Sequence, residues 1–300
     1  MSNPRPLPDV AFEAAQLARP LDWVGMDNIA LPLRLDAALQ VPAQVDVAVN
    51  LGDADKRGIH MSRLYLHTQT ALPETRLDAA SLSALMQALI ESQQGLADRA
   101  RLRLRFDRLL LRPALLSDNQ GWRRYPVSLE LQADAEGQLD AYLQVAVEYS
   151  STCPASAALS RQLNADAFVA AFGQGEVRVD EVQAWLASKA GLAATPHAQR
   201  SVAEVTVQLA ANFQQLPIEA LVNALEQALA TPVQTAVKRE DEQAFARANA
   251  ENLMFCEDAA RRVGATLSTL PVRQWHARVA HLESLHAHDA VASVSGHGQG

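Results

Sequence analysis

The sequence predicts an α+β fold with mostly antiparallel strands. Two patterns support this prediction. In some stretches apolar and polar residues alternate, as in half-buried strands, and in others apolar residues recur at helical spacing. Strand-like and helix-like stretches follow in a similar order in both halves, although the halves share no sequence repeat. A chain of 300 residues, 49% hydrophobic and 20% charged, can bury a sizeable core as one large domain or two smaller ones.

The first half is interpreted as strand, strand, helix, strand, strand. AQVDVAVNL alternates, with Val45, Val47 and Val49 on one side. IHMSRLYLHTQ is interpreted as the neighbouring strand, with GDADKRG as the turn between them. A helix is predicted over about 78–93, because apolar residues there recur at helical spacing. RLRLRFDRLLL is the next strand, and VSLELQADAEGQLDAYLQVAVEYSS predicts a long hairpin that turns around residues 134–138.

The second half begins with a mostly helical segment from Ala155 to about Ala190, interrupted by GQGE. RSVAEVTVQLAANF alternates again and predicts a strand. IEALVNALEQALA and DEQAFARANAENLMFCEDAARRVG predict helices, and PVRQWHARVAHLESLH predicts the final strand.

Composition argues against several classes of protein. The net charge is −8 with acids and arginines interspersed, so we expect no nucleic-acid-binding face. No apolar run reaches the roughly 18 residues of a membrane span, and MSNPRPLPDV lacks the apolar core of a signal peptide. We therefore expect a cytoplasmic protein that binds neither nucleic acid nor membrane. The two cysteines, Cys153 and Cys256, are not expected to form a structural disulfide.

Cys153 lies in SSTCPASAALSRQ, where a predicted strand ends and Pro154 leads into a predicted helix. A helix N-terminus favours the thiolate, which suits a nucleophile or a metal ligand. The alternative is a buried, inert cysteine. Cys256 stands beside Met254 and Phe255, and we assign it to packing.

His197 lies in the loop segment ATPHAQRS, where it can ligate a metal or simply face solvent. Glu242 and Glu257 are 15 residues apart, about four helical turns, so they share a face if their helix is continuous. The alternative is that both are ordinary surface glutamates.

HLESLHAHD carries His286 and His288, which would share one face of a strand. The alternative is a solvated tail. Against a tail, nearby residues provide an apolar side that can be buried: Trp275, Val279, Leu282 and Leu285. A thiol, several imidazoles and two carboxylates together suit a divalent metal, which can be zinc, manganese or iron, and hydrolysis by a metal-bound water.

Seven segments occur in the order typical of one enzyme family: PLDWVGMDNIALPLRL, AQVDVAVNLGDADKRGIHMSRLY, SSTCPASAALS, PHAQRS, VKREDEQ, ENLMFCED and HLESLHAHDA. On these segments the chain resembles the type IB GTP cyclohydrolases over nearly its whole length. The combination of GIHMSRLY, CPxS, HxQRS and ESxHxHD is highly specific. The resemblance implies a tunnelling fold (T-fold), with two tandem units of antiparallel sheet plus helices in each subunit. It also implies a homotetramer with active sites at subunit interfaces. We expect an N-terminal segment at 1–25 and the two units at 26–150 and 151–300.

The resemblance also implies the reaction, which is the metal-dependent hydrolysis of GTP to 7,8-dihydroneopterin triphosphate and formate, the first step of tetrahydrofolate synthesis. By the family's motifs, four residues would surround the metal: Cys153, His197, Glu242 and His286. Cys153 would also be the catalytic thiol, with His288 and Glu283 as proton-transfer or orienting groups. Glu257 would hold the guanine edge, since a carboxylate can accept two N–H donors. Candidates for the triphosphate are His60, Arg63 and Arg200.

The chain departs from the family at Ala155, where C-P-C-S is common. We favour Cys153 as the functional thiol because it leads the motif. The stretch 163–192 is also longer than is common and predicts an added helical excursion. Two alternatives remain. One is a related T-fold enzyme such as the nitrile reductase of queuosine synthesis, whose E-S-x-K motif is missing here. The other is a catalytically silent member.

Overall fold

The computed structural model describes residues 9–36 and 38–299 and contains one eight-stranded sheet. The strands lie in chain order, and every neighbouring pair is antiparallel. The strands are β1 Leu21–Arg34, β2 Gln40–Leu51, β3 Arg99–Pro113, β4 Gln120–Asp134, β5 Leu139–Thr152, β6 Ala198–Gln208, β7 Gln274–His281 and β8 Ala290–His297. The predicted α+β class with antiparallel strands is confirmed.

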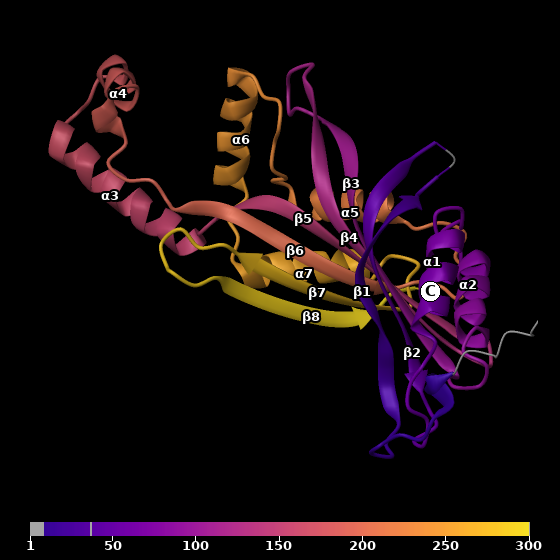
Figure 1. Ribbon diagram of the computed structural model, residues 1–300. Helices are drawn as coiled ribbons and strands as arrows, with labels where there is room; N and C mark the ends of the chain where they lie inside the picture. The colour runs from indigo at the N-terminus through magenta and orange to yellow at the C-terminus, as the bar shows by residue number, and fades with distance from the viewer. Residues whose placement is uncertain (1–8, 37, 300) are drawn as a thin grey trace, which may run out of the picture.

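Helices connect the strands, and several of them cover one face of this sheet (Figure 1). They are α1 Met61–Ala71, α2 Ala79–Glu91, α3 Pro154–Phe172, α4 Val179–Leu186, α5 Ile218–Leu229, α6 Arg239–Glu251 and α7 Cys256–Leu267. The predicted alternation explains the core, because Val45, Val47 and Val49 are almost completely buried beneath the helices. The helix predicted over 78–93 and the hairpin around 134–138 are also confirmed.

The order of elements repeats in part. The first half reads β1, β2, α1, α2, β3 and β4, and the second reads β5, β6, α5, α7, β7 and β8 once α3, α4 and α6 are set aside as additions. The division into two units stays a prediction, and its boundaries after 25 and after 150 fall inside β1 and β5. Eight residues of the expected N-terminal segment lie outside the described residues. Within the described ranges, no helix is long and apolar enough to cross a membrane.

The interpretation of IHMSRLYLHTQ as a strand was wrong, because Met61–Ala71 forms α1. Leu64 and Thr68 are its buried residues, one helical turn apart, so the segment buries a helical face rather than alternate residues. The position beside β2 is occupied by β1, which the alternation did not reveal. Two register shifts interrupt the pairing of β1 with β2, and such irregularities blur a period of two.

The long helix predicted from DEQAFARANAENLMFCEDAARRVG is in fact two helices, α6 and α7, separated by residues 252–255. The backbone at the break pairs with the end of β5, where Met254 N donates to Thr152 O at 3.2 Å. Because the helix is interrupted, Glu242 and Glu257 do not share one continuous helical face.

The predicted final strand ends at His281, and a further strand, β8, follows after a loop. His286 and His288 lie in that loop rather than on a strand. The apolar side predicted for this segment is only half correct. Trp275 and Val279 are buried, but Leu282 and Leu285 are exposed.

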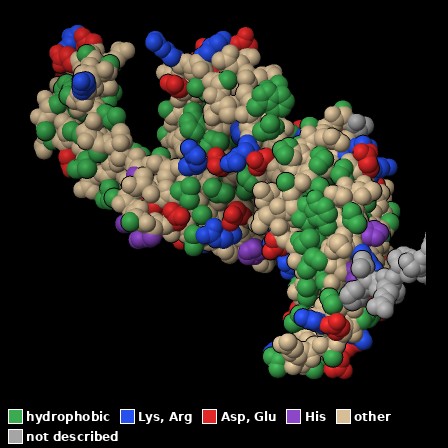
Figure 2. Space-filling model, viewed as in Figure 1, with side chains coloured by type: hydrophobic (Ala, Val, Ile, Leu, Met, Phe, Trp, Pro, Cys, Tyr) green, Lys and Arg blue, Asp and Glu red, His purple; other side chains and the backbone are tan. Residues whose placement is uncertain are grey.

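The predicted excursion forms an arm, which we define as residues 154–196 and which projects from one end of the sheet (Figure 1). In its outer part Phe168, Phe172 and Trp185 pack on one another, with ring centroids 5.0–5.8 Å apart. Asn164 joins the two branches of the arm through two hydrogen bonds of 3.0 Å with the backbone of Ala194. Hydrophobic side chains are exposed along the arm (Figure 2), including Leu159 at 65% and Leu163 at 55%.

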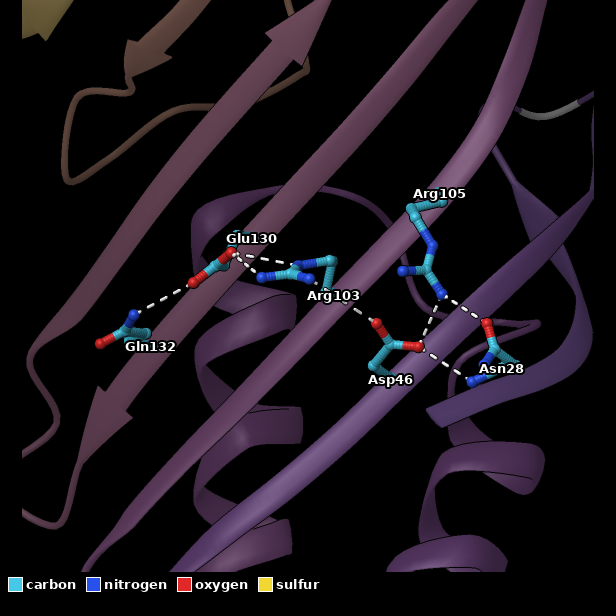
Figure 3. A network of polar contacts seen from close by, with 6 residues as sticks. All are labelled: Asn28, Asp46, Arg103, Arg105, Glu130 and Gln132. Atoms are coloured by element: carbon cyan, nitrogen blue, oxygen red, sulfur yellow. Dashed lines mark hydrogen bonds and ion pairs between the residues drawn. The ribbon is translucent and has the colours of Figure 1, made fainter. Parts of the chain in front are cut away.

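The sheet face opposite the helices carries a network of charged residues (Figure 3). Asp46 accepts hydrogen bonds from Arg105 Nη2 at 2.7 Å and from Asn28 N at 2.9 Å. Arg103 Nη2 and Nε donate to Glu130 at 2.8 and 3.1 Å. Burial acts to raise the pKa of Glu130, but the hydrogen bonds from Arg103 bring it below its ordinary value. Arginines that alternate along β3 are therefore held in ion pairs on this face.

Candidate active site

The predicted thiol lies at the edge of the sheet where β5 ends and β6 begins. Cys153 is the N-cap residue of α3, and Pro154 occupies the first turn of that helix. Cys153 N donates to His197 O at 3.2 Å, so the register of β5 and β6 holds the two residues opposite each other. The thiol is partly buried. A thiol residue and an imidazole residue from separate sequence segments are thus neighbours across the two strands.

His197 is held by contacts from three directions. Its backbone N donates to Ser156 Oγ at 3.1 Å. Its Nδ1 lies 2.9 Å from Gln199 Oε1 and 3.8 Å from Glu283 Oε2. The ring is therefore fixed in orientation, with Nδ1 occupied by the protein.

Glu283 is the third member of this group and comes from the segment after β7. Its side chain is 12% exposed, and within the described part of the chain its Oε2 is buried without a hydrogen-bond partner. A buried carboxylate oxygen without a donor is costly, so its place is explained if a proton, a cation or a substrate N–H meets it. This orphaned atom beside His197 is what points to a site at this end of β5 and β6.

His286 and His288 lie nearby in the loop between β7 and β8. Their rings stack with centroids 5.1 Å apart and planes inclined by 15°. Ser284 Oγ contacts Ala198 O at 3.4 Å, which holds the loop against the start of β6. Both imidazoles are exposed, and purple histidine surface is visible beside the base of the arm (Figure 2).

Glu242 lies elsewhere, in the first turn of α6. That turn is anchored to the loop between β3 and β4, because Asp241 accepts hydrogen bonds from Leu116 N and Ser117 N at 2.8 and 2.9 Å. Among residues 9–36 and 38–299, no group of three or more His, Cys, Asp and Glu side chains is close enough to hold a metal. One described chain thus does not assemble the predicted metal set of Cys153, His197, Glu242 and His286.

The donors nevertheless fit part of a metal site. A thiol and an imidazole are ligands that zinc, manganese and iron all accept, and the unpartnered oxygen of Glu283 lies 3.8 Å from His197 Nδ1. The carboxylate of Glu242 is the component that the single chain does not bring to this group.

Glu257 is exposed in the first turn of α7. Backbone N–H groups at the helix start lower its pKa, and Cys256 Sγ, 3.3 Å from Oε2, adds to this effect. The carboxylate is therefore ionised at neutral pH and open to a ligand with N–H donors. Burial raises the pKa of Cys256 to about 11, with a further rise from Glu257. Cys256 is a member of the hydrophobic core, which confirms its assignment to packing.

The three predicted triphosphate residues are not brought together. His60 is the N-cap residue of α1, with Nε2 3.6 Å from Asp9 Oδ2. Arg63 Nη1 donates to Ser92 O at 2.9 Å. Arg200 lies on β6 with Nη1 3.9 Å from Glu148 Oε2. The start of α1 and the start of β6 are at opposite ends of the sheet in Figure 1. If these residues serve one ligand, more than one chain is needed.

Comparison with known proteins decides the family. The family model described as "Type I GTP cyclohydrolase folE2" matches residues 7–292. The chain belongs to the type I GTP cyclohydrolase FolE2 family. A FolE2 relative from Chromohalobacter salexigens, named GTP cyclohydrolase FolE2, is 48% identical over 291 residues, which are 97% of this chain and 95% of the relative.

Solved structures show the fold of this FolE2-family chain. A hyperthermostable mutant of Bacillus sp. TB-90 urate oxidase matches with a TM-score of 0.51 and 6% identity, covering 92% of this chain and 98% of the other. A second structure of Bacillus sp. TB-90 urate oxidase matches with a TM-score of 0.50 and 6% identity, covering 92% and 99%. The predicted T-fold is confirmed, and at such low identity the likeness shows the fold alone.

Sequence reasoning missed a group of buried polar residues behind the site of this FolE2-family chain: Tyr149, Ser151, Gln199, Ser201 and His281. The sequence does contain a pattern that indicates this group. In the segments YSSTC and HAQRS, polar residues alternate at the period of a strand, on the same face as Cys153 and His197. They could have been found by asking which face of each strand the predicted thiol and imidazole occupy.

Proposed function

We propose that this protein is a GTP cyclohydrolase that hydrolyses GTP to 7,8-dihydroneopterin triphosphate and formate, at the entry to tetrahydrofolate synthesis. Membership of the FolE2 family supports the activity. The observation that carries the assignment to a site is the buried, unpartnered Oε2 of Glu283 beside His197, whose backbone is hydrogen-bonded to that of Cys153. We also propose that this enzyme is cytoplasmic.

A divalent cation, which can be manganese, zinc or iron, would be held by Cys153, His197, Glu242 and His286. When bound, such a cation lowers the pKa of water and makes a nucleophile available at neutral pH. Cys153 and His197 are already opposed across β5 and β6, and the loop of His286 packs against the same strand. Because α6 is anchored away from this group, we infer that a second copy of the chain supplies Glu242.

Proton transfer would fall to Glu283 and His288. Glu283 is largely buried, and its free oxygen can take up or hold a proton as water adds to C8 of the guanine ring. His288 stacks on His286 at the exposed side and can exchange protons with solvent. The two groups would serve the buried and the exposed side of the site.

Substrate recognition would use Glu257 for the guanine edge and His60, Arg63 and Arg200 for the triphosphate. The ionised carboxylate of Glu257 can accept N–H donors from the ring and the exocyclic amine, and an adenine ring offers a different pattern. Because these residues are spread over one chain, we propose a homo-oligomer, a homotetramer, with active sites at its interfaces.

The test is incubation of the purified protein with GTP and Mn²⁺, followed by detection of pterin fluorescence and of formate. We expect product with GTP, and none with ATP or after removal of the metal by a chelator. Zn²⁺ and Fe²⁺ are tested in parallel, because the donor set accepts all three. Absence of a fluorescent product with every metal would overturn the proposed function.

A further inference from the structure

Behind His197 the helix-facing side of the sheet carries three successive rows of polar residues instead of core hydrophobics. Cys153 and His197 form the first row, Ser151 and Gln199 are register partners in the second, and Tyr149, Ser201 and His281 form the third across β5, β6 and β7. The residues of the second and third rows are at most 8% exposed. Polar groups at such depth need partners.

These groups are linked by short hydrogen bonds that run from His197 into the core. His197 Nδ1 lies 2.9 Å from Gln199 Oε1, and Gln199 Nε2 donates to Ser151 Oγ at 2.6 Å. Ser151 Oγ and Ser201 Oγ are 2.7 Å apart. The far end of the group is Tyr149, whose OH lies 2.9 Å from His281 Nε2.

At the far end of this group, the protonation states of Tyr149 and His281 bear on the direction of their hydrogen bond. Burial raises the pKa of Tyr149 and lowers that of His281, so a protonated phenol faces a neutral imidazole. When the imidazole proton is on Nδ1, the phenol donates to the free electron pair on His281 Nε2. The Ser201 hydroxyl acts to lower the pKa of Tyr149, its neighbour in the third row, while its contact with Ser151 connects the third row to the second.

At the near end, the surroundings of His197 favour hydrogen-bond donation toward the core. The Glu283 carboxylate, 3.8 Å from His197 Nδ1, favours a proton on that nitrogen. A protonated Nδ1 requires an acceptor, and the oxygen end of the Gln199 amide faces it. The hydrogen bonds that link His197, Gln199, Ser151 and Ser201 can therefore all run in one direction, from His197 into the core.

We propose that Gln199 is a positioning residue, backed by Ser151, Ser201, Tyr149 and His281, that holds the proton of His197 on Nδ1 and leaves Nε2 free to bind a divalent cation. This inference rests on the proposed role of His197 as a metal ligand. Partners behind a ligand imidazole fix its tautomer and orientation, and their loss costs roughly 10- to 100-fold in metal affinity or activity.

The test uses the full-length protein labelled with ¹⁵N-histidine. Solid-state NMR of the metal-free protein reports which ring nitrogen of each of the eight histidines carries a proton. A His197→Asn variant assigns the signal. Mn²⁺ affinity is measured at pH 8 from the free-ion EPR signal. We expect the Nδ1–H tautomer at His197 in the native chain. Gln199→Leu should reduce that population and weaken Mn²⁺ binding by roughly 10- to 100-fold.

Gln208→Leu is the matched control, because Gln208 is a buried glutamine on the same strand whose Nε2 donates to Asp140 instead. It should change neither readout. If Gln199→Leu does not fold, Ser151→Ala takes its place, since it removes the hydroxyl that orients the Gln199 amide. An Nε2–H tautomer in the native chain, or an unchanged tautomer and Mn²⁺ affinity in the variant, would overturn the inference. Neither readout needs GTP turnover, so the inference and the proposed function can fail separately.

Discussion

Cys153 is the single cysteine of its motif, because Ala155 stands where the family commonly has a second one. The structure gives Cys153 the N-cap position of α3 and a backbone hydrogen bond to His197, and so links it directly to the second proposed ligand. At the residue scale the site therefore depends on one thiol, one oriented imidazole and one buried carboxylate.

Cys153→Ser is expected to lower Mn²⁺ affinity and GTP turnover by roughly 100-fold or more, since losing a ligand should exceed the loss of an outer partner. Isothermal titration with Mn²⁺ and the pterin assay measure both. Ala155→Cys is the matched variant and should leave turnover within about threefold if Cys153 alone is functional. Full activity in Cys153→Ser would remove this thiol from the mechanism.

Glu257→Gln is expected to reduce kcat/KM for GTP by about 10- to 150-fold, because a hydrogen bond to a charged group contributes about 1.5–3 kcal/mol. Steady-state kinetics measure the effect. Mn²⁺ binding should not change, since Glu257 is not among the proposed ligands. The control Glu251→Gln changes an exposed glutamate at the end of α6 and should leave kcat/KM unaltered. Equal effects of the two substitutions would contradict a role in guanine recognition.

At the scale of single elements, α6 is held by its first turn. Asp241 accepts hydrogen bonds from Lys238 N, Leu116 N and Ser117 N, and Ser117 Oγ donates at 2.6 Å. Every partner of Asp241 is a hydrogen-bond donor, so this position requires an ionised carboxylate. These hydrogen bonds, with that of Ser117 first, hold the pKa of Asp241 well below its usual range. One side chain thus joins α6 to the loop between β3 and β4.

Asp241→Asn is expected to loosen α6, because an amide group would face N–H donors. A group with a lowered pKa in the folded state stabilises fully above its unfolded pKa of about 4 and loses this contribution as pH falls further. Thermal unfolding should therefore show a higher Tm for the native chain than for the variant at pH 7, and this difference in Tm should shrink at pH 3. The control Asp166→Asn, on the exposed surface of α3, should have the same Tm as the native chain at both pH values. A difference in Tm between the native chain and Asp241→Asn that does not change with pH would argue against the ionised carboxylate as its cause.

At the scale of the whole molecule, the sheet and its helices share one main hydrophobic core that joins both halves of the chain. Among the described residues this core has no member between 158 and 197, so the outer part of the arm contributes nothing to it. The arm is inserted between Cys153 and His197, which the strands hold together independently of it.

Replacing residues 165–193 by a short glycine-serine linker is therefore expected to leave the fold intact, with Tm changed by less than about 4 °C. The linker would join Asn164 to Ala194, which already touch through two hydrogen bonds. Differential scanning calorimetry measures Tm, and far-UV circular dichroism checks that the loss of helix matches α4 and the outer part of α3. A much larger fall in Tm would show that the arm supports the core.

The α+β class, the strand β2, the hairpin of β4 and β5 and the helical arm all follow from local sequence patterns. In these segments the hydrophobic period is long and regular, so local burial and backbone geometry agree. Motif order also determined the family and pointed to Cys153 and His197, because the chemistry of a thiol or an imidazole is visible in the residue type alone.

Three features depend on contacts between distant parts of the chain. Residues 61–71 form a helix, α6 and α7 are separate, and Glu242 lies apart from His197. An apolar pattern over eleven residues fits either period, and the choice depends on the surface against which the segment packs. The rows that link His197 to His281 exist because β5, β6 and β7 pair in one register. A shift of one residue would turn these side chains to the other face. Register arises from contacts among distant segments, which no single stretch of sequence contains.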